Sequence, residues 1–147
     1  MIAAGEQIKW RHEEIALKGH AVEARVYAED PVTLLPAAGK IESLVWPEME
    51  HVRVDTGITA GYQVTPFYDP LLAKIIAWGE DRRRAVARLQ QALAATEIKG
   101  VRTNIPLLLA VLSDDAFLAG TVSTTYLESR LAAGFLRRRD DGSQAGV

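Results

Sequence analysis

The chain has 147 residues, of which 48% are hydrophobic and 24% are charged, and its formal net charge is −2. This length is typical of one domain with its own core, and the near-balanced charge gives no reason to expect nucleic acid or a membrane surface as a partner. Because the chain contains no cysteine, disulfides and thiol chemistry are excluded. No apolar run approaches the roughly 20 residues of a membrane-spanning helix, and the first residues do not resemble a signal peptide, so we expect a cytoplasmic location.

The first half of the chain carries strand patterns. Apolar and polar residues alternate from His20 to Tyr27, which indicates a strand with one apolar face. Further strands are predicted over Lys40–Trp46 and Val52–Thr56, and the glycines and proline of residues 57–66 predict turns around brief extended segments. Residues 71–78 are almost wholly apolar, which fits a buried strand or a short helix; their brevity and their flanking proline and glycine favour a strand.

The second half carries helix patterns. Asp81 is a suitable N-cap for a helix with an apolar face, and Gly100 stands where a C-terminal glycine belongs. Short helices are predicted over Ile105–Leu112, from residue 113 or 114 to near Gly120, and from a Thr125–Glu128 capping box to Gly134, with one or two helical turns over residues 13–17. Strands followed by helices predict an α+β fold, with the helices packed at one end or face of an antiparallel sheet.

A polar face on the first strand is the first candidate site. Glu23, Arg25 and Tyr27 share that face, and such a row is most often simply solvated. In the functional interpretation Arg25, steadied by Glu23, offers a planar and permanently charged donor fork to an oxyanion or a carboxylate.

The corner over residues 65–70 is the second candidate. Two prolines flank Phe67, Tyr68 and Asp69, which fixes the backbone locally. The corner is either a rigid turn in which Asp69 caps local amides, or the lip of a site formed by Tyr68 and Asp69. Lys74, the odd member of the apolar run that follows, either reaches an edge, snorkels, or pairs with a carboxylate.

Other catalytic patterns are absent from the sequence. The three histidines lack metal-ligand spacing, so no metal site is expected, and there is neither a glycine-rich phosphate loop nor a G-x-S-x-G nucleophile motif. The residues alone therefore indicate an α+β domain without a complete catalytic set.

Five segments, in order, resemble motifs of the biotin carboxylase family. Residues 19–31 read GHAVEARVYAEDP, similar to the family's GHA[IV]E-x-R-[IV]-x-AEDP. The other four similar segments are LPAAGKI (35–41), VRVDTG (52–57), PFYDPLLAK (66–74) and GVRTN (100–104). The resemblance covers residues 19–131, and it implies the C-terminal domain of an acyl-CoA, pyruvate or urea carboxylase. The fold it implies is a small antiparallel sheet or barrel-like core followed by packed short helices.

The resemblance also implies roles for individual residues. Arg25 matches the arginine that binds the ureido oxygen of biotin, where negative charge gathers during carboxylation, and Glu23 would orient it. Tyr68 and Asp69 match the corner near the biotin site. Biotin on a carrier domain would be the cofactor met by this chain, whereas ATP and Mg²⁺ would be bound by an ATP-grasp part that the sequence does not contain.

We therefore expect a linker or helix from the ATP-grasp part over residues 1–18, the C-terminal domain over 19–134, and a flexible tail over 135–147. The expected partners are the ATP-grasp part, the biotin carboxyl carrier domain and the carboxyltransferase. A homodimer is a further partner, because Arg53 matches a dimer-interface position, although Glu50 departs from the family pattern there. Alone the chain should be inactive. The alternative is an interaction module that docks on a carboxylase subunit or on a carrier domain.

Overall fold

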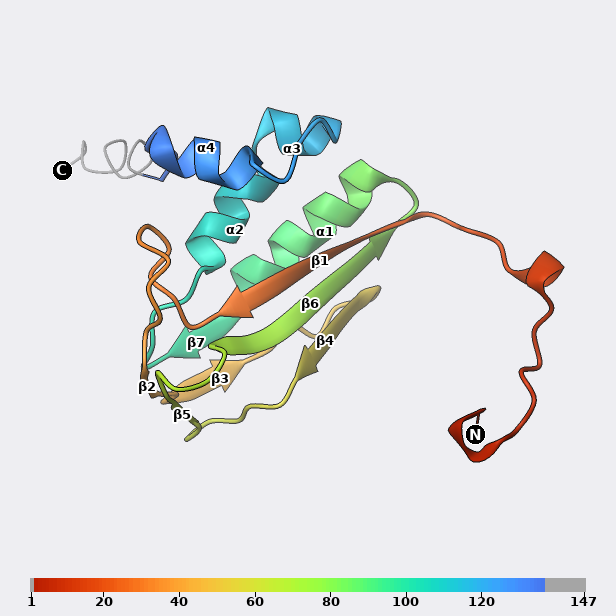
Figure 1. Ribbon diagram of the computed structural model, residues 1–147, viewed down its shortest axis with the longest axis horizontal. Coiled ribbons are helices and arrows are strands. Elements are labelled where there is room, and N and C mark those ends of the chain that lie inside the picture. The colour runs from red at the N-terminus through yellow and green to blue at the C-terminus, as the bar shows by residue number, and fades with distance from the viewer. Residues whose placement is uncertain (1, 137–147) are drawn as a thin grey trace.

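A computed structural model describes residues 2–136 of the chain (Figure 1). Two single 3₁₀ turns, Ile2–Ala4 and His12–Glu14, precede the folded body. The strands are β1 (His20–Tyr27), β2 (Gly39–Lys40), β3 (Ser43–Val45), β4 (Val52–Thr56), β5 (Gln63–Val64), β6 (Leu71–Gly79) and β7 (Glu97–Lys99). The helices are α1 (Arg82–Ala95), α2 (Ile105–Leu112), α3 (Asp115–Ala119) and α4 (Tyr126–Ala132). The expected α+β class is confirmed.

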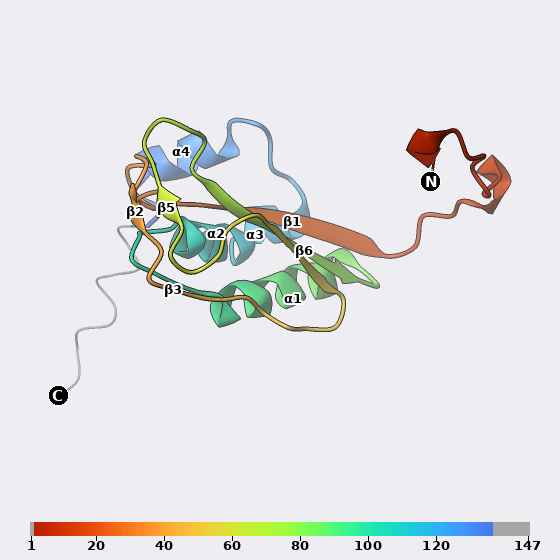
Figure 2. The same cartoon turned by 90° about the horizontal axis from the view of Figure 1, so that it is seen from below.

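The main sheet has three antiparallel strands in the order β1–β6–β4, with α1 packed along one face (Figures 1 and 2). The strands predicted over residues 20–27 and 52–56 are confirmed, and the apolar run after Pro70 is a strand. Alternation places Ala24 and Val26 of β1 on the α1 side, with Ile75 and Ala77 of β6 beside them. The opposite face of the sheet carries the polar residues.

The core between the sheet and α1 explains why this helix lies where it does. Ala85, Val86, Leu89, Ala92 and Leu93 are all buried, and their spacing forms one helical stripe. Each large apolar side chain that is fully buried contributes about 1.5–3 kcal/mol. The predicted N-cap also forms, because the Asp81 carboxylate accepts a hydrogen bond from the backbone N–H of Arg84 at 2.9 Å.

The single strand predicted over Lys40–Trp46 is wrong. The segment contains two short strands that belong to different sheets, since β2 pairs with β5 and β3 pairs with β7. The chain changes partner at its middle: the N–H of Ile41 donates to Tyr62 and the next N–H, of Glu42, donates to Lys99. Ile41 is fully buried in a second, smaller core, which holds the crossover in place.

The role predicted for Gly100 is also wrong. Helix α1 already ends at Ala95, and β7, which the sequence reading missed, lies between the helix and this glycine. Gly100 instead turns the chain after β7 with φ of +100°, and an added Cβ would collide with the carbonyl oxygen of Lys40. Its conformation and this close approach both require glycine.

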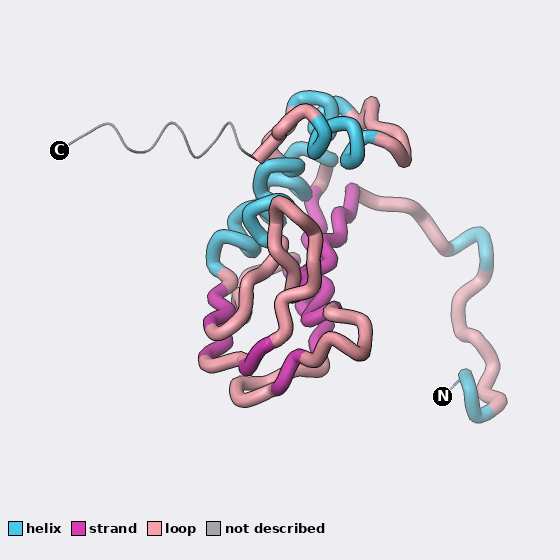
Figure 3. The backbone as a smooth tube through the Cα atoms, turned by 60° about the vertical axis from the view of Figure 1, so that its left-hand side comes forward, coloured by secondary structure: helices cyan, strands magenta, loops and turns pink. Residues whose placement is uncertain are grey.

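Helices α2, α3 and α4 gather at one end of the molecule (Figure 1; the helices are cyan in Figure 3). Asp114 caps α3 by accepting from the N–H of Ala116, and Gly120 ends that helix in the left-handed region, as predicted. The capping box predicted at Thr125 is wrong, since its side chain makes no bond to the helix N-terminus. Instead α4 is attached through Arg130, whose guanidinium lies 2.8 Å from the half-buried carboxylate of Asp114.

Residues 2–18 extend away from the folded body (Figures 1 and 2). The helical turns predicted over residues 13–17 are replaced by the 3₁₀ turn His12–Glu14, and apolar side chains of this arm, Trp10 and Leu17 among them, are exposed. Within residues 2–136, no helix is long and apolar enough to cross a membrane. The predicted tail lies, from residue 137 onward, outside the described residues.

Candidate functional site

The face of the main sheet that α1 leaves uncovered brings charged residues of three strands together. We call it the exposed sheet face; it consists of Glu23, Arg25 and Tyr27 of β1, Lys74 and Ile76 of β6, and Arg53 and Asp55 of β4. The pairing register aligns these side chains in rows across the strands, where directly opposed side chains are neighbours. One row is Arg25–Lys74–Asp55, and the next is Glu23–Ile76–Arg53.

Arg25 lies on this face as predicted. Its Nε donates to the Glu23 carboxylate at 3.2 Å, and its side chain is 59% exposed, so most of the guanidinium remains free for a ligand. The Tyr27 side chain and the Glu23 carboxylate raise the pKa of Arg25 further, which keeps it cationic at any working pH. The bond to Glu23 therefore holds Arg25 without covering it.

Lys74 lies between two charged residues of the neighbouring strands. Its cross-strand neighbours are Arg25 on one side and Asp55 on the other. The Asp55 carboxylate accepts two hydrogen bonds from Arg53, at 2.7 and 2.8 Å. These bonds, together with the charges of Arg53 and Lys74, hold the pKa of Asp55 below its ordinary value. Lys74 therefore stands beside a carboxylate, and it adds a second cation next to Arg25.

Tyr68 and Asp69 lie in the loop before β6, next to the C-terminal end of β1. The Pro70 carbonyl accepts from the N–H of Ala28, which joins this corner to β1. Asp69 accepts from the N–H of Leu71 at 2.9 Å, so it does cap a local amide, while the Tyr68 side chain is exposed. Among the described residues, no hydrogen bond or ion pair links either of them to Arg25.

Glu29 is the titratable group that the corner perturbs. Partial burial, and then the charge of Asp69, raise the pKa of Glu29 above its ordinary value. Glu29 also lines a largely apolar cavity of about 320 Å³, together with Tyr27, Asn104 and residues of α2 and α4. The cavity thus adjoins the same end of β1 as the corner.

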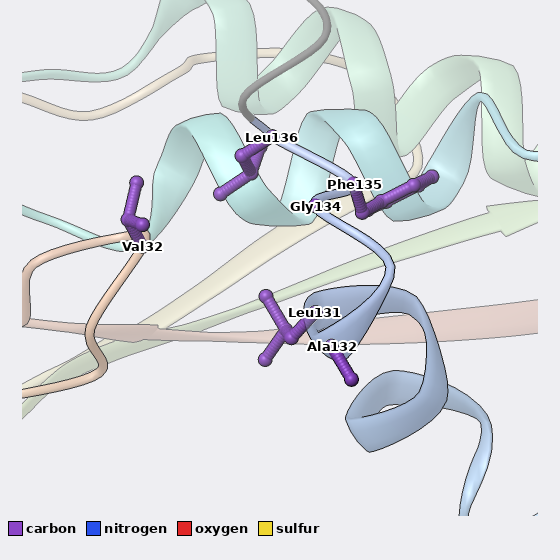
Figure 4. Close-up of a pocket in the computed structure, with 6 residues that line it drawn as sticks. All are labelled: Val32, Leu131, Ala132, Gly134, Phe135 and Leu136. Atoms are coloured by element: carbon purple, nitrogen blue, oxygen red, sulfur yellow. The ribbon is translucent and has the colours of Figure 1, made fainter.

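A second cavity, of about 190 Å³, lies between Val32 and the end of α4 (Figure 4). Its lining residues are Val32, Leu131, Ala132, Gly134, Phe135 and Leu136. None of these has an ionisable side chain, so this cavity offers no acid, base or charged contact. In the described part of the chain, no group of three or more His, Asp or Glu side chains is arranged to hold a metal ion.

Two features of the site were not predicted from the sequence. The Arg25–Lys74–Asp55 row depends on strand pairing between residues far apart in the chain, which no local pattern reports. In the sequence Asn104 is marked only as the last residue of the GVRTN segment, yet its buried side chain bonds the backbone of β1 at Arg25 and Tyr27. The signal that could have found it is an asparagine next to a helix start, a residue type that often bonds backbone groups.

Comparisons with known proteins agree with this geometry. The family model of the biotin carboxylase C-terminal domain matches residues 23–129. The biotin carboxylase of Halalkalibacterium halodurans is 47% identical over 131 residues, which cover 89% of this chain and 29% of that protein. The alpha subunit of the mitochondrial methylcrotonoyl-CoA carboxylase of Rattus norvegicus is 42% identical over 128 residues, covering 86% of this chain and 18% of that protein.

A solved structure gives the same result in three dimensions. The biotin carboxylase domain dimer of the Hydrogenobacter thermophilus 2-oxoglutarate carboxylase, in complex with MgADP, ADP and bicarbonate, superposes with a TM-score of 0.84 at 41% identity. The match covers 88% of this chain and 29% of that one, so the chain spans less than a third of the length of these relatives. The chain belongs to the biotin carboxylase C-terminal domain family.

Proposed function

We propose that this chain forms the biotin-side wall of the active site of a biotin-dependent carboxylase, with Arg25 as its catalytic residue. The observation that carries the proposal is the state of Arg25: it is held on a strand by Glu23, it is permanently charged, and its fork is open to a ligand. An exposed, oriented guanidinium fits the ureido oxygen of biotin, which is a planar acceptor.

Arg25 would act by stabilising negative charge. Carboxylation of biotin requires its ureido nitrogen to be deprotonated, and the charge that results is shared with the ureido oxygen. A guanidinium fixed beside that oxygen acts as an oxyanion hole does, because it meets charge that is larger in the transition state than in the ground state. The neighbouring ammonium of Lys74 adds positive potential to the same row of the sheet.

Tyr68 and Asp69 would border the bound biotin from the corner beside β1. Their loop is held by its prolines and by the Pro70–Ala28 bond, so both side chains project from a fixed backbone. Because neither residue bonds Arg25 among the described residues, we assign them to binding and not to charge stabilisation.

ATP, Mg²⁺ and bicarbonate would be bound by an ATP-grasp part of the same enzyme, and biotin would arrive on a carrier domain. The exposed apolar side chains of the arm, such as Trp10 and Leu17, support residues 1–18 as the connection to that part. We place the domain itself over residues 19–134. A carboxyltransferase would then pass the carboxyl group to an acceptor, whose identity this domain does not choose.

A domain exchange tests the proposal. The matching 131 residues of the H. halodurans biotin carboxylase are replaced by this chain, and release of phosphate from ATP is measured with bicarbonate and free biotin. We expect the chimaera to turn over in a biotin-dependent manner, and this chain alone to release no phosphate above background. A chimaera that folds, by circular dichroism and thermal melting, but shows no biotin-dependent turnover would contradict the proposal, as would clear turnover by the chain alone.

A further inference from the structure

Asn104 is buried, with 7% of its surface exposed, and its side chain forms hydrogen bonds to the backbone of β1. Its Oδ1 accepts from the N–H of Tyr27 at 2.9 Å, and its Nδ2 donates to the carbonyl oxygen of Arg25 at 3.1 Å. Its own N–H donates to the carbonyl oxygen of Tyr27 at 3.2 Å. One residue therefore satisfies three backbone groups at the Arg25–Tyr27 segment.

These bonds support β1 where its pairing with other strands is weakest. Because the order of the sheet is β1–β6–β4, β1 is an edge strand, and the outer side of an edge strand has no strand partner. The pairing of β1 with β6 also shifts register between Val26 and Tyr27, which interrupts the ladder on the inner side. Asn104 thus holds the strand from outside at the point where β6 holds it least regularly.

The Asn104 side chain bonds β1 instead of capping its own helix. Asn104 occupies the N-cap position of α2, where an asparagine normally accepts a hydrogen bond from the first turn of the helix. Here it makes no such cap bond. The first turn of α2 therefore lacks the stabilisation of a side-chain cap. The Asn104 carboxamide instead bonds the backbone of a strand 77 residues away in the sequence.

A second link keeps the loop that carries Asn104 against β1. Arg102 donates to the Asp30 carboxylate at 2.6 Å, just beyond the end of the strand. Gly100 starts the loop with the positive φ described above. The loop is therefore anchored at Arg102 and at Asn104, and these contacts keep Asn104 against β1.

We infer that Asn104 is a positioning residue for Arg25: its carboxamide clamps the backbone from which the guanidinium projects onto the exposed sheet face. The inference rests on the proposed function of Arg25. Catalysis of this kind depends on the placement of the charged group, because a misplacement of about 1 Å can cost on the order of a hundredfold in rate. Loss of the clamp should therefore lower kcat, while binding of ATP elsewhere in the enzyme stays the same.

The test uses Asn104→Leu, which removes both side-chain bonds, and Asn104→Asp, which retains the acceptor for Tyr27 but loses the donor to Arg25. The matched control is Thr96→Val, which removes one part-buried hydroxyl bond, to the Ala92 carbonyl, without touching β1. In this chain alone, ¹⁵N NMR follows the Arg25 Nε–H resonance and the hydrogen exchange of the Tyr27 amide. In the chimaera, kcat and the KM for ATP are measured.

We expect Asn104→Leu to shift the Arg25 Nε–H resonance, to speed exchange of the Tyr27 amide at least about tenfold, and to lower kcat between about tenfold and a hundredfold with the KM for ATP unchanged. Asn104→Asp should move the Arg25 resonance with less effect on the Tyr27 amide. The inference is overturned if the Arg25 resonance and kcat of both variants stay within the range of Thr96→Val. An inactive chimaera with the native Asn104 would contradict the proposed function instead, and the NMR comparison would still decide whether the clamp exists.

Discussion

Arg102 and Asp30 lie 72 positions apart in the chain, yet the Arg102 guanidinium is 2.6 Å from the Asp30 carboxylate. The same carboxylate accepts from the N–H groups of Val32 and Thr33, so it also shapes the turn that follows β1. One side chain thus fixes the end of β1, the turn beyond it and the loop that carries Asn104.

The pH dependence of stability should report this carboxylate. Its bonds to the N–H groups of Thr33 and Val32, and the charge of Arg102, hold the pKa of Asp30 below its ordinary value of 3.8. A lowered pKa in the folded state gives stabilisation that is present above 3.8 and is lost as pH falls through the folded-state pKa. Asp30→Asn should therefore lower the melting temperature at neutral pH, and the difference from the native chain should shrink in acid. Asp115→Asn, at an exposed aspartate, is the control; a gap that stays constant down to acid pH would contradict the assignment.

Glu29 should behave in the opposite sense. Burial and the charge of Asp69 raise its pKa above 4.5, so the folded state resists ionisation of this carboxyl. Stability is then greatest while Glu29 is protonated and is lost as pH rises from 4.5 through the folded-state pKa. Glu29→Gln should raise the melting temperature at neutral pH, with the advantage vanishing below that range. Glu48→Gln, at an exposed glutamate before β4, is the control, and equal behaviour of the two variants would refute the prediction.

Gly100 should tolerate no side chain. Alanine there would have to adopt a positive φ and would collide with the Lys40 carbonyl, so Gly100→Ala should lower the free energy of unfolding by more than about 1 kcal/mol. Gly57 has no heavy atom near an added Cβ, so Gly57→Ala should change stability by no more than about 0.5 kcal/mol. Urea denaturation of the two variants measures the difference, and equal stabilities would show that the turn can rearrange.

The sequence predicted the elements whose signals are local. The alternation in β1, the apolar run of β6 and the Asp81 cap each depend on neighbouring residues, and each was found in the structure. The change of sheet within the Lys40–Trp46 segment was missed for a physical reason: the segment has the pattern of one strand, but Ile41 and the next residue take hydrogen-bond partners from different parts of the chain.

In the candidate site, too, the local relationships could be predicted and the long-range ones could not. Glu23 and Arg25 could be paired from the sequence because residues two apart on a strand share a face. The neighbours Lys74 and Asp55, and the bonds from Asn104, depend on strand register and on a loop that returns to β1, so they required the structure.

The central claim is that Arg25 supplies the positive charge that biotin carboxylation needs. The most direct measurement is kcat of the chimaera with Arg25→Ala, beside Arg83→Ala, which removes an exposed arginine of α1 on the far side of the sheet. We predict that Arg25→Ala lowers kcat at least about a hundredfold, as loss of an oxyanion-hole donor does, while Arg83→Ala has native turnover. An unchanged kcat for Arg25→Ala in a folded and active chimaera would contradict the claim.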